Sequence, residues 1–187
     1  MNIILLSGGS GKRLWPLSND IRSKQFMKIF KEGNHYESMV QRVYRQIRSV
    51  DKEAVITIAT SKSQISMIHN QLGDDVGISM EPCRRDTFPA IALAAAYLHD
   101  VKGVGEEEGV VVCPVDPYVE DDYFEAIVRL GKLAETGKSN LVLMGIEPTY
   151  PSAKYGYIIP TDKGEVSHVS MFKEKPTEEV AREYMEQ

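Results

Sequence analysis

Short apolar runs alternate with helix-like segments along most of the chain, and this alternation constrains the fold more than any other feature. Residues 3–6 are Ile-Ile-Leu-Leu, and similar runs occupy residues 54–59, 76–80, 110–113 and 141–145. Continuous apolar runs of this length are typical of strands that are buried on both faces. Strands that alternate with helices favour a parallel sheet covered by helices on both sides. We therefore expect an α/β fold with a Rossmann-like, doubly wound, mostly parallel sheet.

The segments between these runs have helical spacing. In residues 36–50, for example, apolar residues recur at helical intervals on one face and arginines occupy the other face. Residues 25–30 are short and partly apolar, which predicts an extended segment. The predicted helices cover residues 36–50, 63–72, 90–98 and 123–135.

The pattern changes after residue 155. Residues 155–159 and 166–172 have strand character and flank the turn Asp162-Lys163-Gly164, which is typical of a hairpin. Thr177 is followed by two glutamates, so it is a good N-cap for a last helix over residues 177–187.

The first strand leads into a loop that combines three glycines with two adjacent cations. Gly8, Gly9 and Gly11 allow backbone N–H groups to approach an anion, and Lys12 and Arg13 add positive charge. These properties are typical of a phosphate-binding loop. A glycine-rich surface turn is the alternative interpretation of the loop alone.

Two common nucleotide-binding templates do not match this loop. A Walker A loop requires Gly at position 6 and Ser or Thr at position 13, where the chain has Leu6 and Arg13. A dinucleotide fingerprint that starts at Gly9 requires Gly at position 14, where the chain has Leu14. The loop therefore belongs to neither class.

Composition limits the kinds of partner. The chain has 187 residues, 42% of them hydrophobic, and a net charge of −5, which disfavours binding to nucleic acid or to an anionic membrane. No apolar run approaches the length of a membrane span, and no signal peptide pattern is present. Cys83 and Cys113 lack metal-ligand spacing, so we expect reduced thiols and a cytoplasmic protein.

The polar loops whose residues could bind a ligand or take part in catalysis all follow predicted strands. Residues 8–13 follow the first strand, residues 81–89 the third, and residues 115–118 the fourth. Ligands of doubly wound sheets bind beyond the carboxyl ends of the strands. The sequence therefore predicts one binding site at one edge of the sheet.

Taken together, these loops resemble the sugar-1-phosphate nucleotidyltransferase family, and within it the bacterial mannose-1-phosphate guanylyltransferases. The resemblance extends from residue 1 to about residue 180 and depends on seven motifs in the right order. The motifs are residues 6–18, 24–26, 81–87 with 89–92, 114–116, 145–149, 155–158 and 172–176.

The resemblance implies a transfer of GMP from GTP to α-D-mannose 1-phosphate, which gives GDP-mannose and pyrophosphate. In this family a sugar phosphate oxygen attacks the α-phosphorus of the nucleotide with the help of Mg²⁺. Such a reaction needs positioning and neutralisation of negative charge and no protein nucleophile.

The resemblance also implies roles for individual residues. Arg13 would contact the β- and γ-phosphates, Lys24 would lie between the α-phosphate and the sugar phosphate, and Asp116 would hold Mg²⁺. Glu81 would accept the two N–H donors on one edge of guanine. The implied nucleotide-binding residues are Leu6, Gly8, Gly9, Gly11, Glu81, Asp86 and Thr87. The implied sugar-phosphate residues are Gly145, Tyr155, Gly156, Glu174 and Lys175.

Several positions depart from the usual family pattern, and two of these departures lead to expectations about the site. Ser23 replaces a proline before Lys24, and we expect this change to loosen the loop that presents the lysine. Asp86 replaces an asparagine, which exchanges an amide for a carboxylate that only accepts hydrogen bonds.

Family members continue beyond the last motif with an Asn-Ser-Gly segment and a second metal aspartate. We therefore expect residues 1–187 to be the N-terminal portion of a nucleotidyltransferase domain, with a nucleotide-binding core over residues 1–150. Residues 151–187 would begin the sugar-binding part. Alone, such a chain would turn over slowly, and its uncovered apolar surface would favour a homo-oligomer.

Two alternatives remain open at this stage. The substrates could belong to another branch of the family, such as glucose 1-phosphate with UTP or dTTP. The chain could also be a non-catalytic nucleotide-binding or assembly module that retains the phosphate-binding loop. The leading hypothesis has GTP, mannose 1-phosphate and GDP-mannose as its partners.

Overall fold

The computed structural model describes residues 1–8, 18 and 23–186. The chain divides into two compact units, Met1–Val142 and Leu143–Gln187. Each unit has its own sheet, and each is described by itself.

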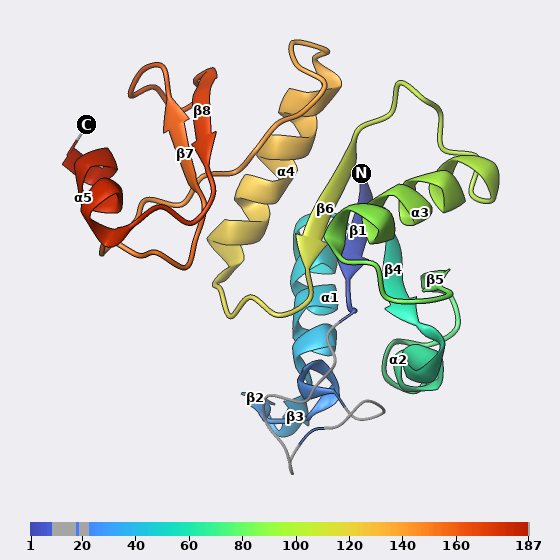
Figure 1. Ribbon diagram of the computed structural model, residues 1–187. Helices are drawn as coiled ribbons and strands as arrows, with labels where there is room; N and C mark the ends of the chain where they lie inside the picture. Colours follow the sequence, from blue (N-terminus) through green and yellow to red (C-terminus); the bar gives the residue numbers. More distant parts are fainter. Residues whose placement is uncertain (9–17, 19–22, 187) are drawn as a thin grey trace. The chain divides into compact units, whose positions relative to one another are not determined.

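The first unit is built on a four-stranded sheet in which every neighbouring pair is parallel. The order of its strands is β5-β4-β1-β6, so the first strand of the chain lies inside the sheet. Parallel pairing places all four carboxyl ends at the same edge (Figure 1). This arrangement confirms four of the predicted strands, which are β1 (Asn2–Leu6), β4 (Val55–Ser61), β5 (Gly77–Glu81) and β6 (Val110–Pro114).

Helices cover both faces of this sheet, as the doubly wound fold requires. On one face, Ile4 and Ala59 pack against Ala94 and Leu98 of α3. On the other face, Gly131 of α4 approaches Val111 closely. Figure 1 shows α3 and α1 on opposite sides of the sheet. The helices of this unit are α1 (Met39–Val50), α2 (Ile65–Leu72), α3 (Thr87–Asp100) and α4 (Asp121–Glu135).

Several element boundaries differ from the predicted ones because local hydrogen bonds decide them. The helix predicted from residue 36 begins at Met39, since Ser38 and Gln41 form a reciprocal capping box. Tyr36 instead belongs to a short antiparallel hairpin of β2 (Phe30–Glu32) and β3 (His35–Glu37). The helix predicted from residue 63 starts as a 3₁₀ turn, η3 (Lys62–Gln64), before α2.

The prediction of an extended segment over residues 25–30 is wrong for its first part. Lys24–Phe26 form a 3₁₀ helix, η2. The Phe26 N–H donates to the Ser23 carbonyl at 3.1 Å, and the Met27 N–H donates to the Lys24 carbonyl at 3.2 Å. Backbone bonds between residues three apart close this turn.

The fifth predicted strand, over residues 141–145, is also wrong. In the described part of the chain these residues belong to no strand, and Leu141 is 74% exposed. An apolar run has strand propensity, but a strand forms only where another strand accepts its backbone hydrogen bonds. The four-stranded sheet ends at β6, and residues 141–145 pair with none of its strands.

The second unit confirms the predicted hairpin and last helix. β7 (Tyr157–Pro160) and β8 (Val169–Lys173) pair in the antiparallel sense, and α5 (Glu178–Glu186) follows them. The buried Tyr157 ring packs near Tyr184 of α5, and its hydroxyl accepts a hydrogen bond from the Ser152 N–H at 2.9 Å. Thr177 caps α5, since its hydroxyl accepts from the Val180 N–H. None of the helices described in either unit is long and apolar enough to cross a membrane.

Helix α3 begins at a strained residue. Asp86 is its N-cap and has φ 74° and ψ −172°, a region that normally requires glycine. Its Oδ1 accepts a hydrogen bond from the Thr87 N–H at 2.9 Å. The carboxylate that replaces the usual family asparagine is therefore engaged in capping a helix, a role that both side chains perform.

Substitutions at Asp86 should separate the cap from the backbone strain. Asp86→Asn should keep the stability of the wild type, and Asp86→Ala should lower the free energy of unfolding by about 1 kcal/mol because the cap is lost. Asp86→Gly loses the cap but removes the strain, so it should be more stable than Asp86→Ala. Urea denaturation followed by circular dichroism measures the free energy of unfolding of each variant. Equal stability of the Ala and Gly variants would show that the backbone at residue 86 is not strained.

Candidate active site

A cavity of about 700 Å³ lies at the edge of the first unit where the carboxyl ends of the strands meet. The ends of β1 and β6, the η2 turn and the loop between β5 and α3 line it. It brings together seven of the residues that the family resemblance implies, namely Leu6, Gly8, Lys24, Glu81, Asp86, Thr87 and Asp116. Gly9, Gly11 and Arg13 lie outside the described residues, so their roles stay predictions.

Lys24 and Asp116 form an ion pair inside this cavity. The Lys24 Nζ lies 2.7 Å from the Asp116 Oδ2, although 92 residues separate them in the sequence. About half of each side chain is exposed, so solvent and ligands can reach both groups. The cation implied to contact phosphates and the carboxylate implied to hold a metal are therefore direct neighbours.

Sheet hydrogen bonds continue past the ends of the strands and fix both sides of the cavity. The Ser7 N–H donates to the Ala59 carbonyl at 2.9 Å, and the Val115 N–H donates to the Leu6 carbonyl at 3.3 Å. The first bond places the start of the glycine loop, and the second places the residue before Asp116. The geometry of the site is thus set by backbone pairing of β1 with its two neighbours.

The loop that carries Asp116 is held on its far side by helix α1. Arg42 and Gln46 both donate hydrogen bonds to the Val119 carbonyl, at 3.1 and 3.2 Å. The Arg42 guanidinium also lies over the Tyr118 ring at 4.9 Å. These contacts come from a helix far from the site in sequence, and sequence reasoning did not identify them.

Glu81 lies against the start of the glycine loop. A methyl group on Gly8 would lie 3.4 Å from the Glu81 Oε1, so the carboxylate occupies the space beside the Gly8 backbone. Glu81 ends β5, which places its side chain at the cavity rather than on a sheet face.

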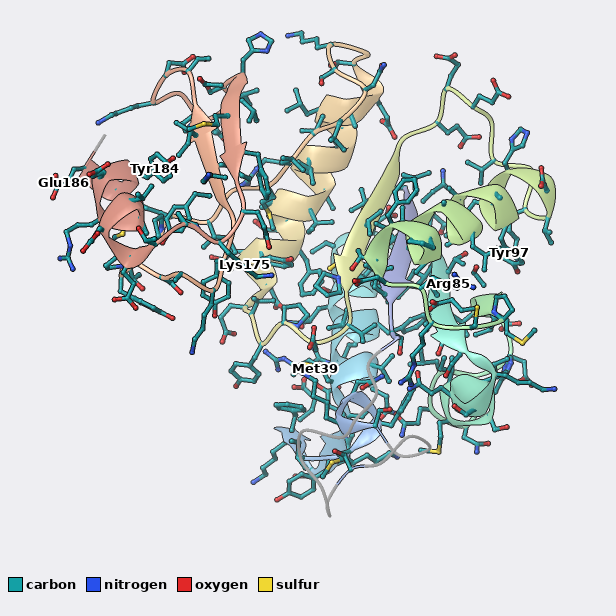
Figure 2. All side chains as sticks on the ribbon, in the orientation of Figure 1. Met39, Arg85, Tyr97, Lys175, Tyr184 and Glu186 are labelled. Carbon is teal, nitrogen blue, oxygen red and sulfur yellow. The ribbon has the colours of Figure 1, made fainter. Side chains whose placement is uncertain are left out.

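The cavity contains four further polar residues that the sequence prediction did not assign, namely Ser7, Gln25, Arg84 and Arg85. Arg84 and Arg85 lie in the loop that leads into α3, where Figure 2 labels Arg85. The neighbouring Cys83 thiol raises the pKa of the Arg85 guanidinium. Gln25 is buried and donates from Nε2 to both the carbonyl and the hydroxyl of Ser7 at 3.3 Å. This loop was identified from the sequence, but no role was assigned to Arg84 or Arg85, and their position next to a predicted phosphate site was the signal that could have identified them.

The structure does not support the expected loosening at Ser23. Its side chain is fully buried, and its Oγ accepts a hydrogen bond from the Gln64 Nε2 at 2.8 Å. The backbone at Ser23 has φ −69°, close to the value that a proline would impose. A buried hydrogen bond therefore holds the position that proline usually restricts in the family.

Few carboxylates of the described residues could hold the Mg²⁺ that the family resemblance implies. In this part of the chain, no group of three or more His, Cys, Asp or Glu side chains could hold a metal ion. Within the described residues, Asp116 therefore fits Mg²⁺ as one carboxylate beside the phosphate oxygens of a nucleotide, which are ligands that this ion accepts.

The two cysteines are free thiols, as expected. Cys83 is exposed, whereas Cys113 belongs to β6 and is buried. Burial raises the pKa of the Cys113 thiol to about 11, and the Tyr123 hydroxyl lies 3.9 Å from its sulfur. Cys113 therefore stays protonated at neutral pH and is not a nucleophile.

Four of the five implied sugar-phosphate residues meet in the second unit. A methyl group on Gly156 would lie 2.8 Å from the Glu174 Oε2 and 2.6 Å from the Phe172 ring, so a side chain there would displace both groups. The Lys175 N–H donates to the Tyr155 carbonyl, and the Lys175 Nζ pairs with the Glu174 Oε1 at 3.0 Å. Lys175, labelled in Figure 2, has a φ of 43°, which is rare for a residue other than glycine.

Gly145 does not join this cluster by any contact in its surroundings. A methyl group placed on it would meet nothing within 4 Å, and the flanking Ile146 is exposed. Its assignment to the sugar-phosphate site stays a prediction.

Known proteins that resemble this chain are nucleotidyltransferases or proteins of alginate or xanthan biosynthesis. A family model described as nucleotidyl transferase matches residues 2–187. A mannose-1-phosphate guanylyltransferase of Escherichia coli is 34% identical over 195 residues, which is 98% of this chain and 40% of the relative. The xanthan biosynthesis protein XanB of Xanthomonas campestris is 37% identical over 97% of this chain. The alginate biosynthesis protein AlgA of Pseudomonas putida is 33% identical over 98% of it. The chain spans about 38% of the length of these last two relatives.

Solved structures agree with the fold. The structure titled mannose-1-phosphate geranyltransferase from Thermus thermophilus matches with a TM-score of 0.78 and 26% identity, over 99% of this chain and 52% of that one. A putative glucose-1-phosphate thymidylyltransferase from Bacillus anthracis matches with a TM-score of 0.57 and 16% identity, which shows a shared fold. The family match over nearly the whole sequence, together with this site, shows that the chain belongs to the nucleotidyl transferase family.

Proposed function

We propose that this chain forms the nucleotide-binding part of a guanylyltransferase that transfers GMP from GTP to α-D-mannose 1-phosphate, giving GDP-mannose and pyrophosphate. The observation that carries the proposal is the single cavity in which Lys24, Glu81 and Asp116 meet beside Gly8. The choice of mannose 1-phosphate and GTP is supported by two relatives, 33% and 34% identical, that are named mannose-1-phosphate guanylyltransferase. We further propose a cytoplasmic location.

The charges of the cavity suit a triphosphate that must be held and neutralised. Lys24, Arg84 and Arg85 supply three cations to a lining that also holds three carboxylates, those of Glu81, Asp86 and Asp116. We assign Glu81 to the base, Asp86 to the cap of α3 and Asp116 to the metal. The cations are then the groups that face the phosphates, at the edge of the sheet where ligands of this fold class bind. Lys24 is paired with Asp116 before any ligand arrives, so it is already positioned next to the metal carboxylate.

Binding of nucleotide would change the partners of this ion pair. A phosphate group that enters the cavity offers Lys24 a second anion, and Asp116 is then available to Mg²⁺ together with the phosphate oxygens. Bound Mg²⁺ would neutralise charge on the phosphates. Lys24 would hold the α-phosphate and the incoming sugar phosphate close together, which lowers the barrier through positioning.

Glu81 is the residue that we propose to select guanine. Guanine presents two N–H donors on one edge, and a carboxylate can accept both. At the same two positions adenine presents the N1 acceptor and a C–H group, so it would leave one carboxylate oxygen facing an acceptor and the other without a donor. The position of Glu81 beside Gly8 would place the base next to the start of the phosphate loop.

The sugar phosphate would be bound by the cluster of Tyr155, Gly156, Glu174 and Lys175. Glu174 can accept hydrogen bonds from sugar hydroxyls, and Lys175 can meet the phosphate. The close contact between Gly156 and the Glu174 carboxylate, and the strained backbone of Lys175, are consistent with a binding role.

Exchange of labelled pyrophosphate into GTP, with GDP-mannose and Mg²⁺ present, tests the proposed reaction on this chain. Exchange that depends on GDP-mannose and is lost in Lys24→Ala supports a guanylyltransferase. Binding of GDP-mannose with no exchange would instead favour a non-catalytic nucleotide-binding module. A preference for UTP or dTTP in a panel of nucleotides would reject guanine selection by Glu81.

Removal of the Glu81 charge should weaken guanine binding selectively. Glu81→Gln should lower the affinity for GTP by roughly 10- to 100-fold, because the amide leaves one guanine donor unpaired, and should leave ATP affinity nearly unchanged. Isothermal titration calorimetry with both nucleotides measures the selectivity. Glu125→Gln, on the exposed side of α4, is the matched control, and an equal loss for GTP and ATP would contradict base recognition by Glu81.

Replacement of the Asp116 carboxylate by an amide should change the affinity for GTP in opposite directions with and without Mg²⁺. In EDTA, Asp116→Asn should bind GTP roughly two- to five-fold more tightly, because Lys24 no longer pairs with a competing carboxylate. With Mg²⁺ it should bind GTP more weakly than the wild type, because the metal carboxylate is lost. Calorimetric titrations under both conditions measure this crossover. Asp100→Asn is the control, and a change of the same sign in both buffers would contradict the shared role.

A further inference from the structure

Three buried or half-buried glutamines surround the short turn that carries Lys24. Gln64 lies in η3, Gln71 in α2, and Gln25 within the turn itself. Gln64 and Gln71 contact the two ends of residues 23–26, and Gln25 connects the turn itself to Ser7. None of them was assigned a role by sequence reasoning.

The first contact fixes the residue before the lysine. The Gln64 Nε2 donates to the Ser23 Oγ at 2.8 Å, and the Gln64 Oε1 accepts from the Thr60 Oγ1 at 2.9 Å. All three side chains are fully buried. Because Thr60 belongs to β4, this chain of hydrogen bonds connects the turn to the central sheet.

The other contacts fix the residues after the lysine. The Gln25 Nε2 donates to the Ser7 carbonyl and hydroxyl, which ties the turn to the end of β1. The Gln71 Nε2 donates to the Phe26 carbonyl at 2.9 Å, and the Gln71 Oε1 accepts from the Ser38 hydroxyl. The turn is therefore held on both sides of Lys24, while the Lys24 side chain itself stays half exposed.

We propose that Gln64 is a positioning residue for Lys24: its buried hydrogen bond to Ser23 holds the 3₁₀ turn so that the lysine ammonium faces the phosphates in the cavity. The proposal deepens the proposed function, on which its ligand-binding part depends. A lysine has a long side chain with much rotational freedom, so its position is set by how firmly its backbone is held. Buried polar networks with every member paired provide this rigidity.

The test begins with a measurement that needs no ligand. Gln64→Met removes the hydrogen bond at nearly constant volume, and Ser23→Ala removes it from the other side. Both variants should increase hydrogen–deuterium exchange of the Phe26 and Met27 amides by about tenfold, because these amides bond within the turn. Gln46→Met is the matched control, since Gln46 is equally buried but contacts Val119 and Asp121 instead.

The second measurement connects the turn to Lys24. GTP with Mg²⁺ is titrated calorimetrically into the wild type, Gln64→Met, Lys24→Ala and the double variant. Gln64→Met should weaken GTP binding by up to about tenfold in the wild-type background and have no further effect in Lys24→Ala. A residue that acts only on overall stability would cause the same loss in both backgrounds.

The outcomes separate the two proposals. Faster exchange together with a loss that depends on Lys24 supports the positioning role. Unchanged exchange in Gln64→Met and Ser23→Ala overturns it, and so does a loss of GTP affinity that is equal with and without Lys24. If the wild type binds no GTP, the proposed function fails. The hydrogen–deuterium exchange result alone then decides whether Gln64 fixes the turn.

Discussion

Parallel pairing of β1 with both β4 and β6 is the interaction on which the rest of the first unit depends. It places the first strand of the chain in the interior of the sheet, where Ile3, Ile4 and Leu5 are completely buried. It also brings the carboxyl ends of strands from distant parts of the sequence to one edge. The backbone bonds that continue to Ser7 and Val115 extend this order into the cavity.

The site combines a rigid frame with exposed reactive groups. Lys24 and Asp116 are accessible, yet hydrogen bonds hold the backbone that carries each of them. The bond between the buried Gln64 and Ser23 holds one side, and the bond between the half-buried Arg42 and Val119 holds the other. Such an arrangement suits a transfer between two phosphates, where positioning and charge neutralisation provide most of the catalysis. The strained N-cap of α3 at Asp86 lies in the same cavity lining, where backbone strain commonly accompanies ligand binding.

The residues that the family resemblance implies lie together in the structure, whereas parts of the local structure around them were predicted wrongly. Seven of the implied nucleotide and catalytic residues share one cavity, because the motifs follow strands whose carboxyl ends must meet in a parallel sheet. The strand over residues 141–145 was predicted wrongly, because an apolar run does not reveal whether a neighbouring strand is present to pair with it. The expected loosening at Ser23 failed for a related reason, since its partner Gln64 is 41 residues away.

By itself, the sequence determined the alternation of strands and helices, the parallel sheet and the edge at which its polar loops gather. These follow from local hydrophobic periodicity and from the chirality and pairing rules of α/β folds. Only the tertiary structure decided that Lys24 pairs with Asp116, that Glu81 lies against Gly8, and that buried glutamines hold the lysine turn. These contacts join residues far apart in the chain, so their distances depend on how the whole unit packs rather than on any local pattern.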